Sequence, residues 1–207
     1  NPKYNPRIKQ NSKEQKDFDK NTQIYIYDCV RFSYKVFACI DAYQRTKPDM
    51  LWFLDADIVT FEKIPMSWLE HIIPDTAFTS YLGRPKKGFS ETGYYAFNTA
   101  HKYASEFFER WQTYYDKDRF LELKGYTDSF TFDGARIELE KEGKIKNEDL
   151  NDGRWAGGRR SRHPFINSEL GQYMDHLKGY DRKAAMTSKK RDLTTKQSHP
   201  YWKTLKE

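Results

Sequence analysis

The chain has 207 residues, of which 32% are charged and 16% are aromatic, and its formal net charge is +6. This length fits one folded domain, and the aromatic side chains supply apolar surface for a core despite a mean hydropathy of -0.98. No apolar run approaches the roughly 20 residues that span a bilayer, and no apolar leader is visible, so we expect a cytoplasmic protein without a transmembrane segment. The positive charge favours anionic ligands, including nucleotides, phosphates, acidic glycans and nucleic acid.

The N-terminal part of the chain changes character near Asp28. Residues 1–22 carry many Lys, Asn and Gln side chains with little periodicity, and we expect an irregular arm. Residues 23–27 fit a short strand. Residues 28–43 then follow a helical pattern of apolar positions, with Asp28 as the N-cap.

Two basic residues and both cysteines fall within or beside this predicted helix. Arg31 and Lys35 are four residues apart and share one helix face, which is either a solvated basic face or the side that meets a bound anion. Cys29 and Cys39 would lie about 15 Å apart on one helix, which is too far for a mutual disulfide. We therefore expect two free thiols.

The chain is organised around the stretch 51–60, in which an apolar run leads directly into Asp55-Ala56-Asp57. Such a run predicts a buried strand whose carboxyl end reaches a ligand site. Alternation along the strand would point Asp55 and Asp57 the same way. Two carboxylates on one side suit a hard divalent cation, whereas the alternative is a strand end with two solvated acids.

Further elements follow in chain order. The expected elements are a short helix over 66–73, strands over 77–82 and 90–98, an amphipathic helix over 101–115 with aromatic core positions, and a helix or strand beginning at 127–136. Gly93, within one of these strands, predicts a close approach of another group to the backbone.

The last third of the sequence is rich in charge. Residues 138–150 are expected to face solvent, and residues 153–164 form a Gly-rich loop with four arginines. That loop is either a plain exposed loop or a binding site for an anionic substrate or nucleic acid. The segment from Ser188 onward is basic and polar, and we expect a tail.

These pieces together resemble the GT-A class of nucleotide-sugar glycosyltransferases, in particular the family 8-like enzymes that contain an Asp-x-Asp motif. The resemblance spans roughly residues 28 to 185 and rests on the strand with Asp55-Ala56-Asp57, the upstream helix with Arg31 and Lys35, the stretches 90–94 and 97–98, and the late residues His176, Gly179 and Lys183. The late motif of that family is His-x-x-Gly-x-x-Lys. This chain has one extra residue between Gly179 and Lys183.

The resemblance implies an α/β fold, a GT-A-like or Rossmann-like mixed sheet flanked by helices in a single domain. It also implies a hexosyltransferase-like activity with Mn²⁺ or Mg²⁺ and a nucleotide-sugar donor, preferably a UDP-sugar. The acceptor would be a glycan, a lipid or a protein. Charge develops on the departing diphosphate, and a cation with basic side chains stabilises that charge.

The family pattern also implies a role for each matching residue. Asp57 would ligate the metal, Asp55 would contact the metal or the ribose, and His176 would be the distal metal ligand. Lys183 and the backbone of Gly179 would hold the diphosphate. A second set, Arg31 and Lys35, would face the donor sugar or phosphate.

Glycosyl transfer also needs groups beside the acceptor, and the sequence offers Glu91 and Asp128 as catalytic carboxylates. In an inverting enzyme one carboxylate takes the proton of the acceptor hydroxyl, whereas retaining enzymes of this class lack an obvious base. The sequence leaves both stereochemical outcomes open. Asp128 is otherwise a helix cap or an acceptor contact.

One departure from the family concerns the N-terminus. GT-A domains begin with a base-binding strand and loop well before Asp-x-Asp, whereas only 54 residues precede Asp55 here. We therefore expect a shortened N-terminal half. The expected organisation is an arm over 1–22, a transferase-like domain over 23–187 and a tail over 188–207.

Two other function classes compete with a transferase. A haloacid dehalogenase-like phosphatase also begins with an apolar strand and Asp-x-Asp, in which Asp55 would be the nucleophile and Asp57 the general acid. That family needs a downstream Gly-Asp-x-x-x-Asp pair, which this sequence lacks. The second competitor is a degenerate, non-catalytic GT-A-like module, which the short N-terminus and the arginine loop keep open.

Overall fold

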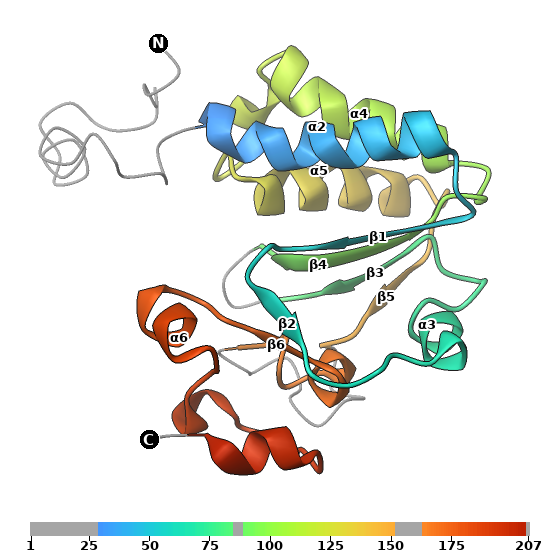
Figure 1. Ribbon diagram of the computed structural model, residues 1–207. Coiled ribbons are helices and arrows are strands. Elements are labelled where there is room, and N and C mark those ends of the chain that lie inside the picture. Colours follow the sequence, from blue (N-terminus) through green and yellow to red (C-terminus); the bar gives the residue numbers. More distant parts are fainter. Residues whose placement is uncertain (1–28, 85–88, 152–162, 206–207) are drawn as a thin grey trace, which may run out of the picture. The chain divides into compact units, whose positions relative to one another are not determined.

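A computed structural model describes residues 29–84, 89–151 and 163–205 (Figure 1). Over these residues the chain forms two compact units: a helical unit of residues 29–47 and 106–136, and a sheet unit of residues 48–105 and 137–205. The predicted arm over 1–22, the strand over 23–27, the N-cap Asp28 and the arginine loop over 153–162 lie outside the described residues. Among the described helices, none combines the length and apolarity needed to cross a membrane.

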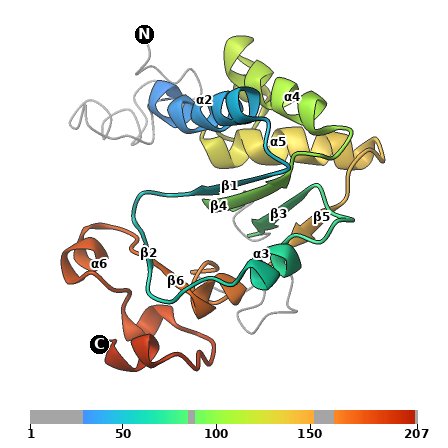
Figure 2. The same ribbon diagram turned by 45° about the vertical axis from the view of Figure 1, so that its right-hand side comes forward.

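The helical unit contains α2 (Cys29–Thr46), the larger parts of α4 (Ala104–Asp116) and α5 (Asp128–Lys141), and the short 3₁₀ helix η2 (Arg119–Glu122). Figures 1 and 2 show the three α-helices side by side. The predicted helices near 28–43 and 101–115 are confirmed, and the segment that begins at 127 is a helix rather than a strand. Cys29 and Cys39 are not joined by a disulfide, as expected.

Aromatic side chains form the core of the helical unit. Tyr43 of α2 stacks on Phe108 of α4 with 4.3 Å between ring centroids. Trp111 packs edge-on against Phe132 of α5, and its indole N–H donates to Thr131 Oγ1 at 3.0 Å. This pairing satisfies the polar tip of a buried tryptophan and fixes how α4 meets α5.

The sheet unit is built on a four-stranded sheet with the order β1-β4-β3-β5. The strands are β1 (Met50–Leu54), β3 (Thr79–Leu82), β4 (Glu91–Asn98) and β5 (Asn147–Asp149). The short helix α3 (Met66–Ile72) precedes β3 in the chain. β4 is antiparallel to β1 and β3, whereas β5 is parallel to β3. The predicted α/β class with a mixed sheet is therefore confirmed.

Two expectations about strands and burial are wrong. β1 is only half-buried, because among the described residues it stands at one end of the sheet and pairs with β4 alone. β4 is the strand that is buried along all but its last residue. The charged stretch 138–150 does not simply face solvent, since it continues α5, supplies β5 and buries Leu139, Ile145 and Leu150.

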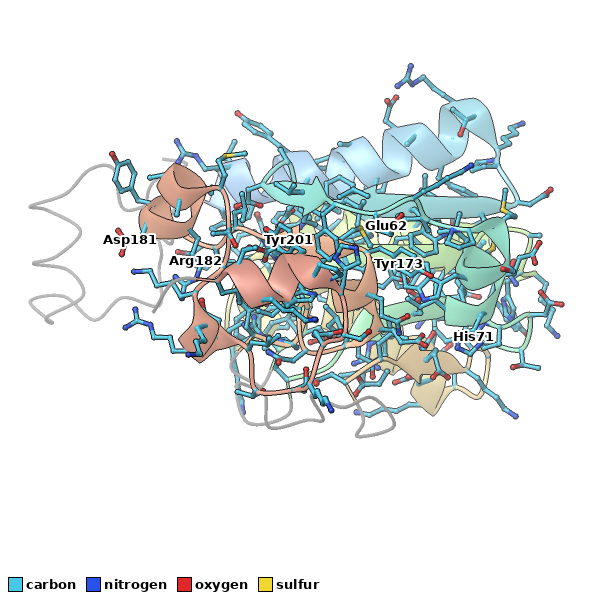
Figure 3. All side chains as sticks on the ribbon, turned by 60° about the horizontal axis from the view of Figure 1, so that its bottom comes forward. Glu62, His71, Tyr173, Asp181, Arg182 and Tyr201 are labelled. Carbon is cyan, nitrogen blue, oxygen red and sulfur yellow. The ribbon has the colours of Figure 1, made fainter. Side chains whose placement is uncertain are left out.

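A second, two-stranded sheet pairs β2 (Ile58–Thr60) with β6 (Met174–His176), which follows the 3₁₀ helix η3 (Glu169–Gln172). After β6 come α6 (Tyr180–Ala185) and the 3₁₀ helices η4 (Lys190–Asp192) and η5 (Pro200–Thr204). On α6, Arg182, which Figure 3 labels, pairs with Asp192 of η4 through Nη2 and Oδ1 at 2.5 Å.

The C-terminal segment belongs partly to the core, whereas the sequence predicts a polar tail from Ser188. Trp202 is 5% exposed, packs with the buried residues of the sheet unit and donates from its indole N–H to the Gly171 carbonyl at 2.7 Å. The buried carboxylate of Asp175 accepts from Ser188 N, Ser188 Oγ and Tyr201 Oη at 2.6–2.8 Å. These bonds tie the segment to β6, directly before His176.

Candidate metal centre

The two aspartates of the central motif lie in a turn and not on the strand itself. β1 ends at Leu54, and the Asp55 carbonyl accepts from Ile58 N at 3.1 Å, which closes a turn around Ala56 and Asp57. Asp55 N donates to the Gly93 carbonyl at 3.0 Å and anchors the turn to β4. The prediction that alternation along a strand points Asp55 and Asp57 the same way is therefore wrong. The turn brings the two carboxylates together instead.

The second sheet brings His176 to this turn. In the β2–β6 register Ile58 lies opposite His176, and Leu177 N donates to the Asp57 carbonyl at 2.9 Å. As a result the ligand atoms of Asp55, Asp57 and His176 all lie within 4.8 Å of one another. The sequence identified His176 only through a motif match. In the structure His176 joins the two aspartates because it ends a strand that lies next to Asp57.

The distances and exposures describe a group that is open on one side. His176 Nε2 lies 3.2 Å from Asp57 Oδ1 and 3.8 Å from Asp55 Oδ2. The histidine side chain is 4% exposed, whereas those of Asp55 and Asp57 are 32% and 25% exposed. Two oxygens and one imidazole nitrogen are suitable ligands for a divalent cation, and they would leave about three positions of an octahedral ion for water or substrate.

Lys183 forms an ion pair with one of these aspartates, Asp57. Its Nζ lies 2.9 Å from Asp57 Oδ2, and its side chain is about half exposed. The hydrogen bond from His176 holds the pKa of Asp57 well below its usual range against the effect of partial burial, and Lys183 adds to the lowering. Gly179 precedes α6 with φ of 82°, a conformation that favours glycine, so the chain can turn from His176 into the helix that carries Lys183.

Behind His176 lies a buried carboxylate, Glu91, the first residue of β4. Its Oε2 pairs with Lys178 Nζ and lies 3.2 Å from Arg84 Nη1, and its Oε1 lies 3.6 Å from His176 Nδ1. Burial acts to raise the pKa of Glu91, but Lys178 and Arg84 outweigh it and bring the pKa to about 2. A carboxylate in this state is ionised at neutral pH and engaged on both oxygens, which does not favour the predicted role of Glu91 as a base for the acceptor.

The His176 ring is held on its remaining sides by close packing. A Cβ atom on Gly93 would lie 2.4 Å from His176 Cε1 and 2.6 Å from Nδ1, so the predicted close approach at Gly93 is confirmed and the approaching group is this ring. Phe165 meets the ring edge-on at 5.3 Å between centroids. His163 contacts the His176 carbonyl through Nε2 at 3.0 Å, and burial lowers the pKa of His163 to about 4. Neutral His163 must therefore carry its proton on Nε2 to donate this bond.

The other predicted site residues belong to the helical unit. Arg31 is exposed on α2. Lys35 pairs with the buried carboxylate of Asp128, the first residue of α5, with 3.2 Å between Nζ and Oδ2. The structure thus brings Lys35 and Asp128 to each other, and their predicted roles toward the donor and the acceptor stay predictions.

Three residues that line the site were missed from the sequence: Arg84, Lys178 and His163. Lys178 follows His176 by two residues, so a second lysine beside the late motif was a usable signal. Arg84 and His163 gave no comparable signal, because each lies in a loop that only the tertiary fold brings to Glu91 or His176.

No protein-family model, curated protein or solved structure matches the chain. The geometry of Asp55, Asp57 and His176, together with the sequence pattern, is therefore the basis for a functional proposal.

Proposed function

We propose that the chain is a metal-dependent glycosyltransferase that moves a sugar from a nucleoside diphosphate donor, preferably a UDP-sugar, to an acceptor hydroxyl. The observation that carries this proposal is the meeting of Asp55, Asp57 and His176 ligand atoms within 4.8 Å, with the Lys183 ammonium group 2.9 Å from Asp57. A divalent ion at these ligands and a cation beside it are the groups that a departing diphosphate requires.

The charges around the site support a diphosphate ligand. The carboxylates of Asp55, Asp57 and Glu91 are balanced by Arg84, Lys178 and Lys183, so the protein groups sum to zero with His176 as a neutral ligand. A bound divalent cation would bring the sum to +2. This matches the roughly two to three negative charges of a nucleoside diphosphate near pH 7.

The proposed reaction assigns separate tasks to these residues. Asp55, Asp57 and His176 would hold a Mn²⁺ or Mg²⁺ ion, which would supply neutralisation of the charge on the diphosphate oxygens. The bond between the sugar C1 and the diphosphate oxygen breaks, and its electron pair stays on the diphosphate beside Lys183. The acceptor oxygen forms the new bond to C1, and its proton passes to a general base or to solvent water. For that acceptor side, Asp128 remains the sequence prediction.

Titration with UDP tests this proposal, because a shared metal site makes nucleotide binding depend on the metal. We expect Mn²⁺ to strengthen UDP binding at least about 10-fold over EDTA in isothermal titration calorimetry, a typical coupling between two ligands. Lys183→Met should weaken UDP binding in Mn²⁺ by about 10-fold, since it removes a charged hydrogen-bond donor. Lys196→Met, at an exposed lysine of the same unit, should leave binding unchanged.

Other outcomes separate the competing functions. Equal UDP binding in Mn²⁺ and EDTA, or none, contradicts the transferase. Hydrolysis of a generic phosphomonoester through a phospho-Asp55 intermediate would support the phosphatase instead. Salt-sensitive nucleic-acid binding without UDP binding would support the non-catalytic module.

A further inference from the structure

We propose that Glu91 is a positioning residue that orients His176 toward the metal and holds Lys178 beside the same site, an inference that rests on the metal centre of the proposed function. The sequence alone suggests a catalytic carboxylate at this position. The geometry points instead to a carboxylate that acts through two other side chains.

The first contact of Glu91 concerns the far side of the His176 ring. His176 Nε2 faces Asp57 and Asp55, while Nδ1 faces Glu91 Oε1 at 3.6 Å. Nδ1 is buried and forms no hydrogen bond among the described residues. A shift of a few tenths of an ångström would bring it within the ordinary range of about 2.7–3.2 Å, and such bonds often tighten when the ligand binds.

This arrangement has a defined chemical consequence. A neutral imidazole can bind a metal through one nitrogen only if its proton sits on the other, and a carboxylate beside Nδ1 favours the proton there. Glu91 therefore leaves the lone pair of Nε2 free for the metal and aligns the ring. Gly93 supports the same geometry, because any side chain there would occupy the place of the ring.

The second contact of Glu91 concerns the cations of the site. Glu91 Oε2 pairs with Lys178 Nζ and with Arg84 Nη1, so one carboxylate joins β4, the loop after β3 and the segment after β6. Lys178 lies two residues after His176, and the carboxylate that it pairs with also faces the His176 ring. The ion pair with the buried Glu91 carboxylate holds this flexible, partly exposed side chain in place.

Two substitutions at Glu91 separate positioning from charge. We expect Glu91→Gln, which keeps the shape of the side chain, to weaken Mn²⁺ binding by about 10- to 100-fold in the absence of nucleotide. Glu91→Asp keeps the charge but withdraws the carboxylate by one methylene, and positioning predicts a loss in the same range. A role through charge alone predicts normal Mn²⁺ affinity for Glu91→Asp.

A second measurement is which ring nitrogen of His176 carries a proton. This protonation would stay unchanged in a Glu91 variant if the role of Glu91 were merely structural. In long-range ¹H–¹⁵N spectra of the metal-free protein, where Nε2 donates to Asp57, we expect Nδ1 of wild-type His176 to carry a proton as well and Glu91→Gln to lower the proton occupancy of Nδ1. Glu169→Gln is the matched control, since Glu169 is also a buried glutamate paired with a histidine, His71, at 3.4 Å. This control should leave both Mn²⁺ affinity and the His176 spectrum unchanged.

The outcomes distinguish this inference from the proposed function. Normal Mn²⁺ affinity and an unchanged proton occupancy of His176 Nδ1 in Glu91→Gln overturn the positioning role while the metal site stands. Weakened Mn²⁺ binding in both Glu91 variants, together with Mn²⁺-independent UDP binding, supports the positioning role and overturns the transferase. Wild-type protein that binds no Mn²⁺ overturns both.

Discussion

Asp57→Asn is expected to weaken Mn²⁺ binding by more than about 100-fold, because loss of a group that only supports a metal ligand already costs about 10- to 100-fold. Asp57 lies at the centre of the site: one carboxylate oxygen is 3.2 Å from His176 Nε2 and the other is 2.9 Å from Lys183 Nζ. Asparagine keeps the size of the side chain, so the turn between β1 and β2 should persist. Mn²⁺ titration followed by electron paramagnetic resonance measures the free ion directly.

The control for this prediction is Asp75→Asn, which removes the same charge at an exposed position of the same unit. It should leave Mn²⁺ affinity within about 2-fold of the wild-type value, since screened surface charges act weakly over distance. Equal affinities for Asp57→Asn and the wild type would show that the ion does not bind at this turn.

Trp202→Ala is expected to lower the free energy of unfolding by about 3–5 kcal/mol, the usual cost of removing a buried tryptophan side chain. Trp202 is 5% exposed, packs among the buried residues of the sheet unit and loses its hydrogen bond to Gly171 in the variant. Urea denaturation followed by circular dichroism gives the free energy, provided that the transition is two-state.

Tyr180→Ala is the matched control, because this aromatic side chain is 85% exposed on α6. Its effect should stay within about 0.5 kcal/mol. If Trp202→Ala unfolded at the same urea concentration as Tyr180→Ala, the C-terminal segment would contribute nothing to the core.

The sequence predicted the residues of the candidate metal group better than the way in which they meet. Asp55 and Asp57 stand out because an apolar run ends in two acids, and a motif match pointed to His176. The turn that brings the two carboxylates together depends on hydrogen bonds between residues such as Asp55 and Gly93, which are 38 positions apart. Local periodicity carries no information about such pairings, so the expectation of strand alternation failed.

This lack of long-range information also explains why neither the ionised, paired state of Glu91 nor the burial of Trp202 was predicted. An acid near a predicted site suggests catalysis, but its state depends on Lys178 and Arg84, which reach it only in the folded chain. Trp202 lies in a basic, polar stretch whose composition predicts a tail, and only its packing among distant core residues overrides that pattern. Helices α2, α3 and α4 and the long strand β4, by contrast, have strong local patterns and were predicted within a few residues.

The central claim is that Asp55, Asp57 and His176 bind one divalent ion, and anomalous diffraction from a crystal grown with Mn²⁺ and UDP tests it most directly. We predict one manganese peak at about 2.0–2.4 Å from an Asp57 oxygen and from His176 Nε2, with a UDP phosphate oxygen completing the coordination. A manganese peak at other residues, or none at this turn while UDP is bound, would contradict the claim.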